Sequence, residues 1–268
     1  MIAFVGGTAW LLGTLSSGLS GNAYATPGMG KDCSKCHGSK SKDVAKAFKG
    51  FTDNFMTETC DGFSSEGTNP YFVLQPGYQL ILEGKKKKDT LRIEVTVLDA
   101  TKTFTLDLGD GVMTNVVTRV VQERESRNGV LAEISKNYFA ICNRTNSVFY
   151  FGEDVDIYDA TGTTVIDHSG SWLAGPDGAR PGIAMPGVIL VGGKYFQEVA
   201  PGLALDRSEI VSMTEAVETP AGAFLNCLQT LETSALEKGK GYKFYAPGIG
   251  LIRDDADALL LTQHGMVP

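Results

Sequence analysis

The chain of 268 residues contains few of the residues and none of the short motifs that mark common enzyme classes. It has three histidines and five cysteines. A G-x-S-x-G elbow, an H-E-x-x-H pair and a P-loop are all absent from the sequence. No large basic face with interleaved aromatic residues is present, so a nucleic-acid partner is not indicated. We therefore do not expect an enzyme.

The first 25 residues carry no charged side chain, and they end in the small-x-small triplet AYA at residues 23–25. An apolar segment of this length with such a triplet is typical of a secretory signal cleaved before Thr26. The usual positive start is missing, because the first cationic residue is Lys31. A start further upstream, a retained anchor and a cytoplasmic location are the alternatives. We predict export, to the periplasm or the cell surface.

Charge divides the remaining chain into two parts. Residues 26–60 contain six lysines and four acidic residues, a net charge of +2. Because the whole chain carries −7, residues 61–268 carry −9. Within residues 26–60, the stretch "SKDVAKAFKGF" has its apolar residues at helical spacing. We expect a signal peptide at residues 1–25, a small helical module with a linker at residues 26–66, and a β-domain at residues 67–268.

The long C-terminal part has the pattern of successive β-strands. In "TLRIEVTVLD", apolar residues at 91, 93, 95 and 97 alternate with polar ones, and "KKKKD" before it is a polar hairpin loop. Similar strands follow one another with tight turns and no helical pattern between them. The predicted fold is mainly β: a large antiparallel curved sheet, an open barrel or a sandwich, preceded by the short helical module. The glycine- and proline-rich segment Gly170–Gly187 is predicted to be an ordered flap across the sheet.

The segment "CSKCH" has the C-x-x-C-H spacing of a c-type haem attachment site. Two thiols on one helical turn can add to the two vinyl groups of haem, and the adjacent imidazole can bind the iron. The stretch "GMGKDCSKCHG" resembles the haem-binding helix of c-type cytochromes. That resemblance implies one covalent haem c held by Cys33 and Cys36, with His37 as the proximal ligand.

Two other interpretations of these cysteines remain open. Cys33, Cys36, His37 and Cys60 include the ligand types of a structural zinc site. Adjacent Cys36 and His37 do not both reach a tetrahedral ion easily, and no second C-x-x-C is present. A redox-active dithiol or a disulfide normally opens a helix after a strand, and no such unit is visible.

Met56 is the best candidate for the sixth iron ligand, since Met29 lies too near the motif. A side chain of the β-domain, a neighbouring subunit or an open site are the alternatives. So small a module leaves a haem edge exposed, which suits electron transfer. The lysines around it would steer an acidic redox partner. His168 and His264 are expected to be ordinary surface residues.

Three cysteines lie outside the motif. We expect either a disulfide between Cys142 and Cys227, which we favour, or two buried thiols. Cys60 would then be a free thiol, an intermolecular link or a metal ligand.

Five carboxylates are candidate ligands or acid–base groups. The alternating Asp154 and Asp156 make a calcium site conceivable, but structural or surface roles are favoured. The other three are Glu153, Glu198 and Asp206.

The segments "YFGEDV", "GSWLAG" and "YAPGIG" resemble those of a family of uncharacterised exported bacterial β-proteins. The resemblance brings no activity with it. We expect an exported single-haem electron carrier or redox sensor whose β-domain docks a partner. The alternative is a non-redox envelope module that binds an apolar ligand or a protein. Association with a membrane or the envelope, and an oligomer with haem at its contacts, are also considered.

Overall fold

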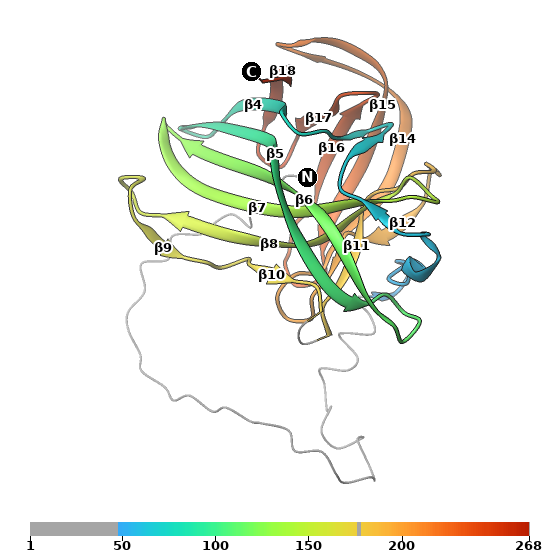
Figure 1. Cartoon of the computed structure of the whole chain (residues 1–268). Coiled ribbons are helices and arrows are strands. Elements are labelled where there is room, and N and C mark those ends of the chain that lie inside the picture. The colour runs from blue at the N-terminus through green and yellow to red at the C-terminus, as the bar shows by residue number, and fades with distance from the viewer. Residues whose placement is uncertain (1–47, 176–177, 268) are drawn as a thin grey trace.

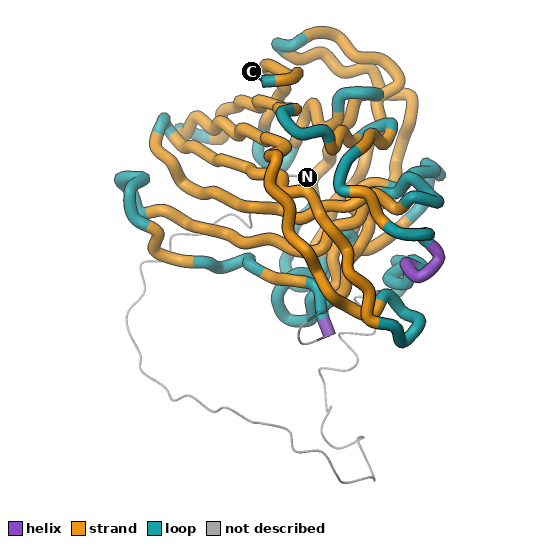
Figure 2. The backbone as a smooth tube through the Cα atoms, in the orientation of Figure 1, coloured by secondary structure: helices purple, strands orange, loops and turns teal. Residues whose placement is uncertain are grey.

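Residues 48–175 and 178–267 are described by the computed structural model, and most of them belong to one antiparallel sheet. The sheet curves until it is nearly closed into a barrel (Figure 1). Strands dominate the backbone and loops join them at the two ends (Figure 2). This confirms the prediction of a mainly β fold with a curved antiparallel sheet.

The elements follow one another closely, with short turns between most of them. A 3-10 helix, η2, spans Thr57–Thr59. The strands are β1 (Phe63–Ser64), β2 (Gly67–Asn69), β3 (Phe72–Leu74), β4 (Tyr78–Lys86), β5 (Asp89–Asp107), β6 (Met113–Arg127), β7 (Val130–Cys142), β8 (Val148–Tyr158), β9 (Val165–Asp167), β10 (Trp172–Leu173), β11 (Arg180–Met185), β12 (Lys194–Phe196), β13 (Glu198–Val199), β14 (Asp206–Thr219), β15 (Gly222–Ser234), β16 (Gly241–Ala246), β17 (Gly250–Asp254) and β18 (Leu259–Met266).

The strand order of the sheet is β12-β14-β15-β16-β17-β18-β4-β5-β6-β7-β8-β11-β13. Most neighbours in this order are also neighbours in the sequence. The exception in the middle is the pair β18 and β4, in which Leu261 lies opposite Leu82. The last strand of the chain therefore joins two sets of sequential strands into one sheet.

The segment Lys194–Val199, which forms β12 and β13, connects the two ends of this order. Tyr195 pairs with Ser208 of β14, and the Gln197 amide donates a hydrogen bond to the Asp206 carbonyl at 2.8 Å. The next residue, Glu198, pairs with Pro181 of β11. One short segment is thus bonded to both ends of the sheet, and we call it the closing strand.

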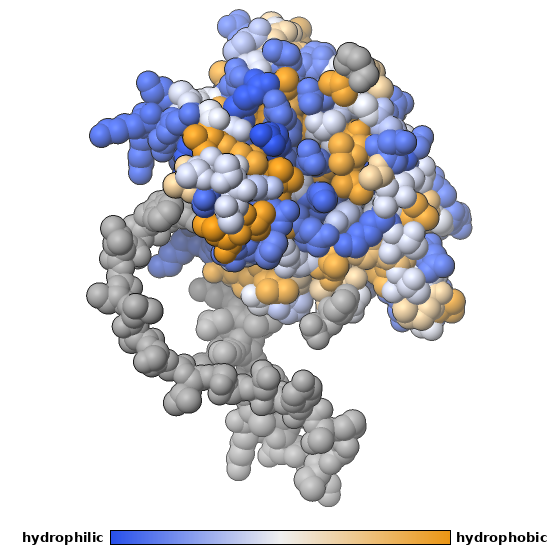
Figure 3. Space-filling model, turned by 60° about the vertical axis from the view of Figure 1, so that its left-hand side comes forward, coloured by the Kyte–Doolittle hydropathy of each residue, from blue (hydrophilic) through white to orange (hydrophobic). Residues whose placement is uncertain are grey.

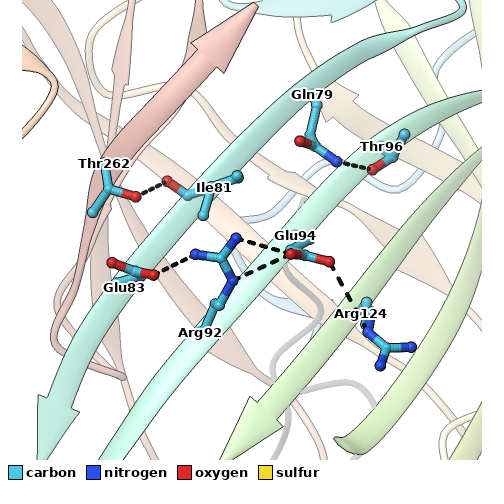
Figure 4. Close-up of polar contacts among 8 residues, drawn as sticks. All are labelled: Gln79, Ile81, Glu83, Arg92, Glu94, Thr96, Arg124 and Thr262. Carbon is cyan, nitrogen blue, oxygen red and sulfur yellow. Dashed lines mark hydrogen bonds and ion pairs between the residues drawn. The ribbon is translucent and has the colours of Figure 1, made fainter. Parts of the chain in front are cut away.

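The alternation predicted for residues 91–97 is confirmed. Leu91, Ile93, Val95 and Val97 are all buried on the inner side of β5. The polar residues between them point outward, where Arg92 contacts both Glu83 and Glu94 across and along the strands (Figure 4). Exposed pairs of this kind contribute about 0–1 kcal/mol each, so the stability of the sheet comes from its inner side.

Residues 48–55 pack against the closing strand, to which Thr52 is hydrogen-bonded. Phe48 stacks on Phe196 with ring centroids 4.5 Å apart, and Phe51 meets the same ring edge-on. The predicted helical haem module is not seen in the described part of the chain, because residues 48–66 form η2, β1 and turns. The rest of that module, residues 26–47, lies outside the described residues. Residues Phe48–Phe55 instead cover the seam of the barrel.

The cysteine pairing differs from the one we favoured. Cys142 at the end of β7 forms a disulfide with Cys60, while Cys227 is a buried free thiol. β1 lies beside β7, with Phe63 opposite Cys142, which brings Cys60 within reach. Linking positions 82 residues apart restricts the unfolded chain, which stabilises the fold by about 4–5 kcal/mol in the chain-entropy model. No sequence signal distinguished these partners.

The segment Gly170–Gly187 is part of the sheet and does not form a separate flap. Its β10 pairs with β8, where Trp172 lies opposite Glu153. Its β11 also pairs with β8 and carries the contact with the closing strand. The glycines and prolines suggested a loop, but β11 contains Pro181 and Gly182, and Gly182 lies at a close backbone approach.

Apolar side chains on the face shown in Figure 3 form separate patches with polar areas between them. Exposed large apolar residues are scattered through the described chain, as in most soluble proteins. Among the described residues, no helix combines the length and apolar character needed to cross a bilayer.

Gly182 of β11 lies where the closing strand approaches most closely. A Cβ at this position would lie 2.4 Å from the carbonyl carbon of Gln197 and 2.6 Å from the nitrogen of Glu198. Both are backbone atoms, so the strands would have to separate to admit even a methyl group.

We predict that Gly182→Ala loosens the seam, because its methyl group must push the closing strand from β11. Amide hydrogen exchange at residues 196–199 should accelerate at least tenfold, and the free energy of unfolding should fall by about 1–3 kcal/mol. The control is Gly129→Ala, in the turn between β6 and β7, where no atom lies within 4 Å of the added Cβ. Its φ of 79° makes alanine costly to stability, but the local protection of residues 196–199 should not change. Unchanged protection of these amides in a folded Gly182→Ala protein would contradict the prediction.

Candidate binding site in the barrel interior

The inner side of β6 changes from apolar to acidic along the strand. Val121 lies opposite Val97, whereas the next inward residue, Glu123, lies opposite Val95. Glu123 is 6% exposed. Because alternate residues of a strand share one face, Glu125 also lies on the inner side. An acidic stripe therefore runs along a face that is otherwise the core of the protein.

The polar surface continues across β7 and β8. Asn137 is fully buried and receives a hydrogen bond from the Tyr150 hydroxyl at 2.5 Å. It donates in turn to Ser135 Oγ at 3.0 Å. Glu153 lies opposite Asn137 in the sheet and is 5% exposed. These side chains form a polar wall on adjacent strands.

An ion cluster occupies the inner side of β15, β16 and β17. The Lys243 ammonium lies 2.6 Å from Glu232 Oε2 and 3.8 Å from Asp254 Oδ2, and all three side chains are at most 4% exposed. The Tyr245 hydroxyl donates to Glu232 Oε1 at 3.3 Å. Burial acts to lower the pKa of Lys243, but the two carboxylates outweigh it and raise the pKa. Lys243 is therefore a charged ammonium inside the barrel.

The two walls face one another across the interior. The charge of Lys243 on β16 acts on Glu123 of β6, although β17, β18, β4 and β5 lie between these strands in the sheet. At the seam, the closing strand contributes Glu198, whose carboxyl group interacts with those of Asp206 and Glu153. We call Glu153, Glu198 and Asp206 the seam carboxyl cluster.

Burial is the main cause of the raised pKa values in this interior. It raises the pKa of Glu153 to about 8, with the neighbouring charge of Glu123 adding to the effect. Burial, followed by the charge of Asp206, holds the pKa of Glu198 well above its ordinary value. The pKa of Asp206 is raised to about 6, and burial is again the largest cause. The pKa values of Glu123 and Glu133 are each raised to about 7. Part of the interior is therefore protonated near neutral pH.

Several buried polar atoms here make no hydrogen bond of good geometry within the described residues. They include one carboxyl oxygen of Glu153 and the hydroxyl of Thr230 on the inner face. The same holds for two neighbouring pairs, the Glu198 carboxyl with the Trp172 indole and the Tyr195 hydroxyl with Ser208, in which the groups lie close enough to affect the pKa values of Glu198 and Tyr195. Native proteins leave few such atoms, because each costs about 1–3 kcal/mol. Their concentration on one inner face requires a reason other than stability.

Two hollows elsewhere in the described residues are weak candidates for a ligand site. An apolar cavity lined by Leu80, Val95, Val121 and Tyr245 has a volume of about 30 Å³, far below the roughly 300–1,000 Å³ of ordinary ligand sites. A polar hollow of about 320 Å³ lies beside Arg180. There the guanidinium group already pairs with Asp53 at 2.9 Å.

The predicted haem ligands Cys33, Cys36 and His37 lie outside the described residues. Met56 is described, and its side chain is 58% exposed at the start of η2. Cys60 is used in the disulfide, so it is not available as the fourth zinc ligand of a Cys33–Cys36–His37 site in this state.

The five carboxylates named from the sequence separate into two groups. Glu153, Glu198 and Asp206 meet in the seam cluster. Asp154 points outward, where it accepts a hydrogen bond from Tyr138 and pairs with Lys102 at 3.2 Å. Asp156 contacts the exposed His168 at 3.0 Å. No metal-binding group of three or more His, Cys, Asp or Glu side chains is found within residues 48–175 and 178–267.

Sequence reasoning missed Glu123, Glu133, Glu232, Lys243 and Asp254. The sequence did contain one signal: Glu123 and Glu125 occupy every second position after the apolar Val121, so all three side chains lie on the same face of the strand. In comparisons with known proteins, the chain matches no family model, no curated protein and no solved structure.

We predict that the barrel becomes less stable as the pH rises from about 5 to about 8. An unfolded glutamate titrates near 4.3, whereas Glu153 in the folded protein keeps its proton until about pH 8. The folded state therefore binds more protons in this window, and its advantage is lost as the pH rises. The measurement is the melting temperature across this range.

Glu153→Gln should flatten this pH dependence, because the amide mimics the protonated acid but does not titrate. The matched control is Glu218→Gln, whose side chain is exposed on β14 and which should leave the profile unchanged. A profile for Glu153→Gln as steep as that of the unmodified chain would show the prediction to be wrong.

Proposed function

We propose that this chain is an exported binding protein whose barrel takes a small polar ligand into its interior. The observation that carries the proposal is the set of buried polar atoms on the inner face that make no hydrogen bond of good geometry in the described chain, among them one carboxyl oxygen of Glu153 and the hydroxyl of Thr230. A barrel interior is a common place for a ligand, since the surrounding strands hold side chains in fixed positions.

The energetics support a binding role over a purely structural one. A well-packed apolar interior would be as stable or more stable than one with buried carboxyl groups. Unpartnered groups are retained at sites where they meet something else, and they are stabilised when it binds. The apolar cavity, with a volume of about 30 Å³, is too small for the apolar ligand considered from the sequence.

The test uses n-butylamine, n-butanol and butyrate, which share one body and differ in the head group. Binding is followed by calorimetry and by the fluorescence of Trp172, which is 3% exposed beside Glu198, in a full-length chain carrying Trp10→Phe. We expect at least one compound to bind saturably, with a dissociation constant in the millimolar range for so small a molecule. It should also perturb Trp172. No saturable binding by any of the three would reject the proposal.

We propose as a second function that the N-terminal segment carries one covalent haem c for electron transfer or redox sensing. The C-x-x-C-H spacing of Cys33, Cys36 and His37 supports this, and the exposed side chain of Met56 is compatible with the role of distal ligand. The lysines of residues 31–49 suit an acidic redox partner.

The haem proposal predicts a pyridine haemochrome spectrum with the α-band of a two-thioether adduct when the chain is matured in a c-type haem pathway. The colour should survive washing in acidified organic solvent, because thioether bonds hold the porphyrin. Cys33→Ala/Cys36→Ala should be colourless after washing, and Cys227→Ala serves as the cysteine control. Complete loss of colour from the unmodified chain would refute covalent haem.

A further inference from the structure

We propose that one end of the barrel docks on an anionic membrane surface. This end is formed by three turns that meet beside the closing strand, residues 48–51, 200–205 and 235–240, and we call it the basic end. It lies on the outside of the protein, so its role is independent of the ligand proposed for the barrel interior.

A backbone hydrogen bond and a shared apolar cluster hold the three turns together. The Ala235 amide donates a hydrogen bond to the Leu205 carbonyl at 3.0 Å, which joins the second turn to the third. Phe48 of the first turn stacks on Phe196 with ring centroids 4.5 Å apart. Phe196 and Leu205 belong to one small buried cluster, and Phe48 and Ala235 both pack against it. The basic end is therefore one continuous surface.

The exposed side chains of this surface are mainly leucine and lysine. Leu203 is 64% exposed in the second turn, and Leu236 is 47% exposed in the third. The turns also contain three exposed lysines: Lys49, Lys238 and Lys240. None of these lysines forms an ion pair with a residue in the described part of the chain. Large apolar side chains and unpaired cations thus lie close together on adjoining turns.

The charge of the basic end is opposite to that of the rest of the domain. The three turns contain three lysines and one acidic residue, Glu237, a net charge of +2. Residues 61–268 as a whole carry −9. An anionic surface would therefore attract this end of the protein and repel the remainder, which fixes the orientation of docking.

The N-terminal part of the chain adds to this charge. Residues 26–47 join the described chain at Phe48, and they contain five lysines and two aspartates, a net charge of +3. Like charge makes this segment a poor occupant of the basic end. Residues 1–25 carry no charge at all, so they offer nothing with which the lysines could pair. The occupant that fits is an anionic surface outside the chain.

An acidic protein is the nearest alternative, but the residue types favour a membrane. The centres of protein interfaces are enriched in aromatic residues and arginine and depleted in lysine. At a bilayer, leucines enter the boundary of the acyl chains, while long lysine side chains reach the phosphate groups. Leu203 and Leu236 beside unpaired lysines have the chemistry of that boundary.

The lysine run Lys85–Lys88 provides an internal comparison. It contains more lysines than the basic end, but Lys86 already pairs with Asp257 at 2.8 Å. The loop from Lys85 to Asp89 contains no apolar side chain. If charge alone decided docking, this hairpin would bind as well as the basic end. Variants of the two lysine groups therefore separate the two possibilities.

The experiment places one tryptophan at a time on the surface of the full-length chain carrying Trp10→Phe. Leu203→Trp and Leu236→Trp report on the basic end. Leu190→Trp is the matched control, because Leu190 is 67% exposed in the loop at the other end of the closing strand. The remaining Trp172 is 3% exposed and gives a constant background. Vesicles contain phosphatidylcholine alone or mixed with phosphatidylglycerol, with or without brominated lipid, which quenches an indole that enters the bilayer.

With anionic vesicles, the emission from positions 203 and 236 should shift to the blue. Brominated lipid should quench it at least twofold more strongly than the emission from position 190. The effect should weaken at high salt and in phosphatidylcholine alone, because counterions and neutral head groups remove the attraction. Attachment through the N-terminal segment alone would not produce this signal, since it comes from one side chain of the basic end.

Charge variants then test the lysines. In the Leu203→Trp chain, Lys238→Glu/Lys240→Glu should reduce the quenching at least twofold, whereas Lys85→Glu/Lys88→Glu should leave it unchanged. All these side chains are exposed, and unchanged melting temperatures would confirm that the variants fold. If Leu203→Trp does not fold, Leu236→Trp provides the same test.

Three results would overturn the proposal. The first is quenching at position 190 as strong as at position 203, or none at positions 203 and 236. The second is a blue shift at position 203 that depends on protein concentration without lipid, which would assign the surface to a second copy of the chain. The third is salt-sensitive binding of poly-glutamate with no response to vesicles, which would assign it to an acidic protein. None of these results bears on ligand binding inside the barrel.

Discussion

The barrel depends on the hydrogen bonds that the closing strand makes with β14 on one side and β11 on the other. Without them the sheet would have two free edges and an inner face open to water. The same short segment carries Tyr195, Gln197 and Glu198, which contribute polar groups to the interior. Closure of the sheet and assembly of the candidate site are therefore one structural event. Gly182 is needed at this point because it lets the two backbones meet.

The interior balances two opposing effects. Apolar residues such as Leu82 and Val95 stabilise the fold by leaving water, whereas buried carboxyl groups oppose it. The barrel tolerates these acids in two ways. It pairs Glu232 and Asp254 with Lys243, and it keeps a proton on groups such as Glu153 at neutral pH. The disulfide between Cys60 and Cys142 adds stability that does not depend on the interior.

The sequence allowed the strands and their inner faces to be predicted, because alternation in segments such as residues 91–97 is a local property. It also named Glu153, Glu198 and Asp206 individually. It could not show that they meet, since β8, the closing strand and β14 come together only through the closure of the sheet. The pairing of Cys60 with Cys142 could not be predicted for a similar reason: Cys60 follows η2, Cys142 ends β7, and only the pairing of β1 with β7 brings them together. The segment Gly170–Gly187 was predicted as a flap because its strands are short and β11 contains Pro181 and Gly182, residues typical of loops.

The pairing of β18 with β4 determines when this protein can finish folding. Hairpins such as β4–β5 and β6–β7 need only neighbouring residues and can form early, because closing a short loop costs little entropy. The contact of Leu261 with Leu82 joins strands from opposite ends of the described chain. Until β18 is available, β4 has an unpaired edge, and the partly built sheet can associate with other chains through it. A chain that emerges gradually during its synthesis is thus most prone to aggregation just before β18 emerges and can pair with β4.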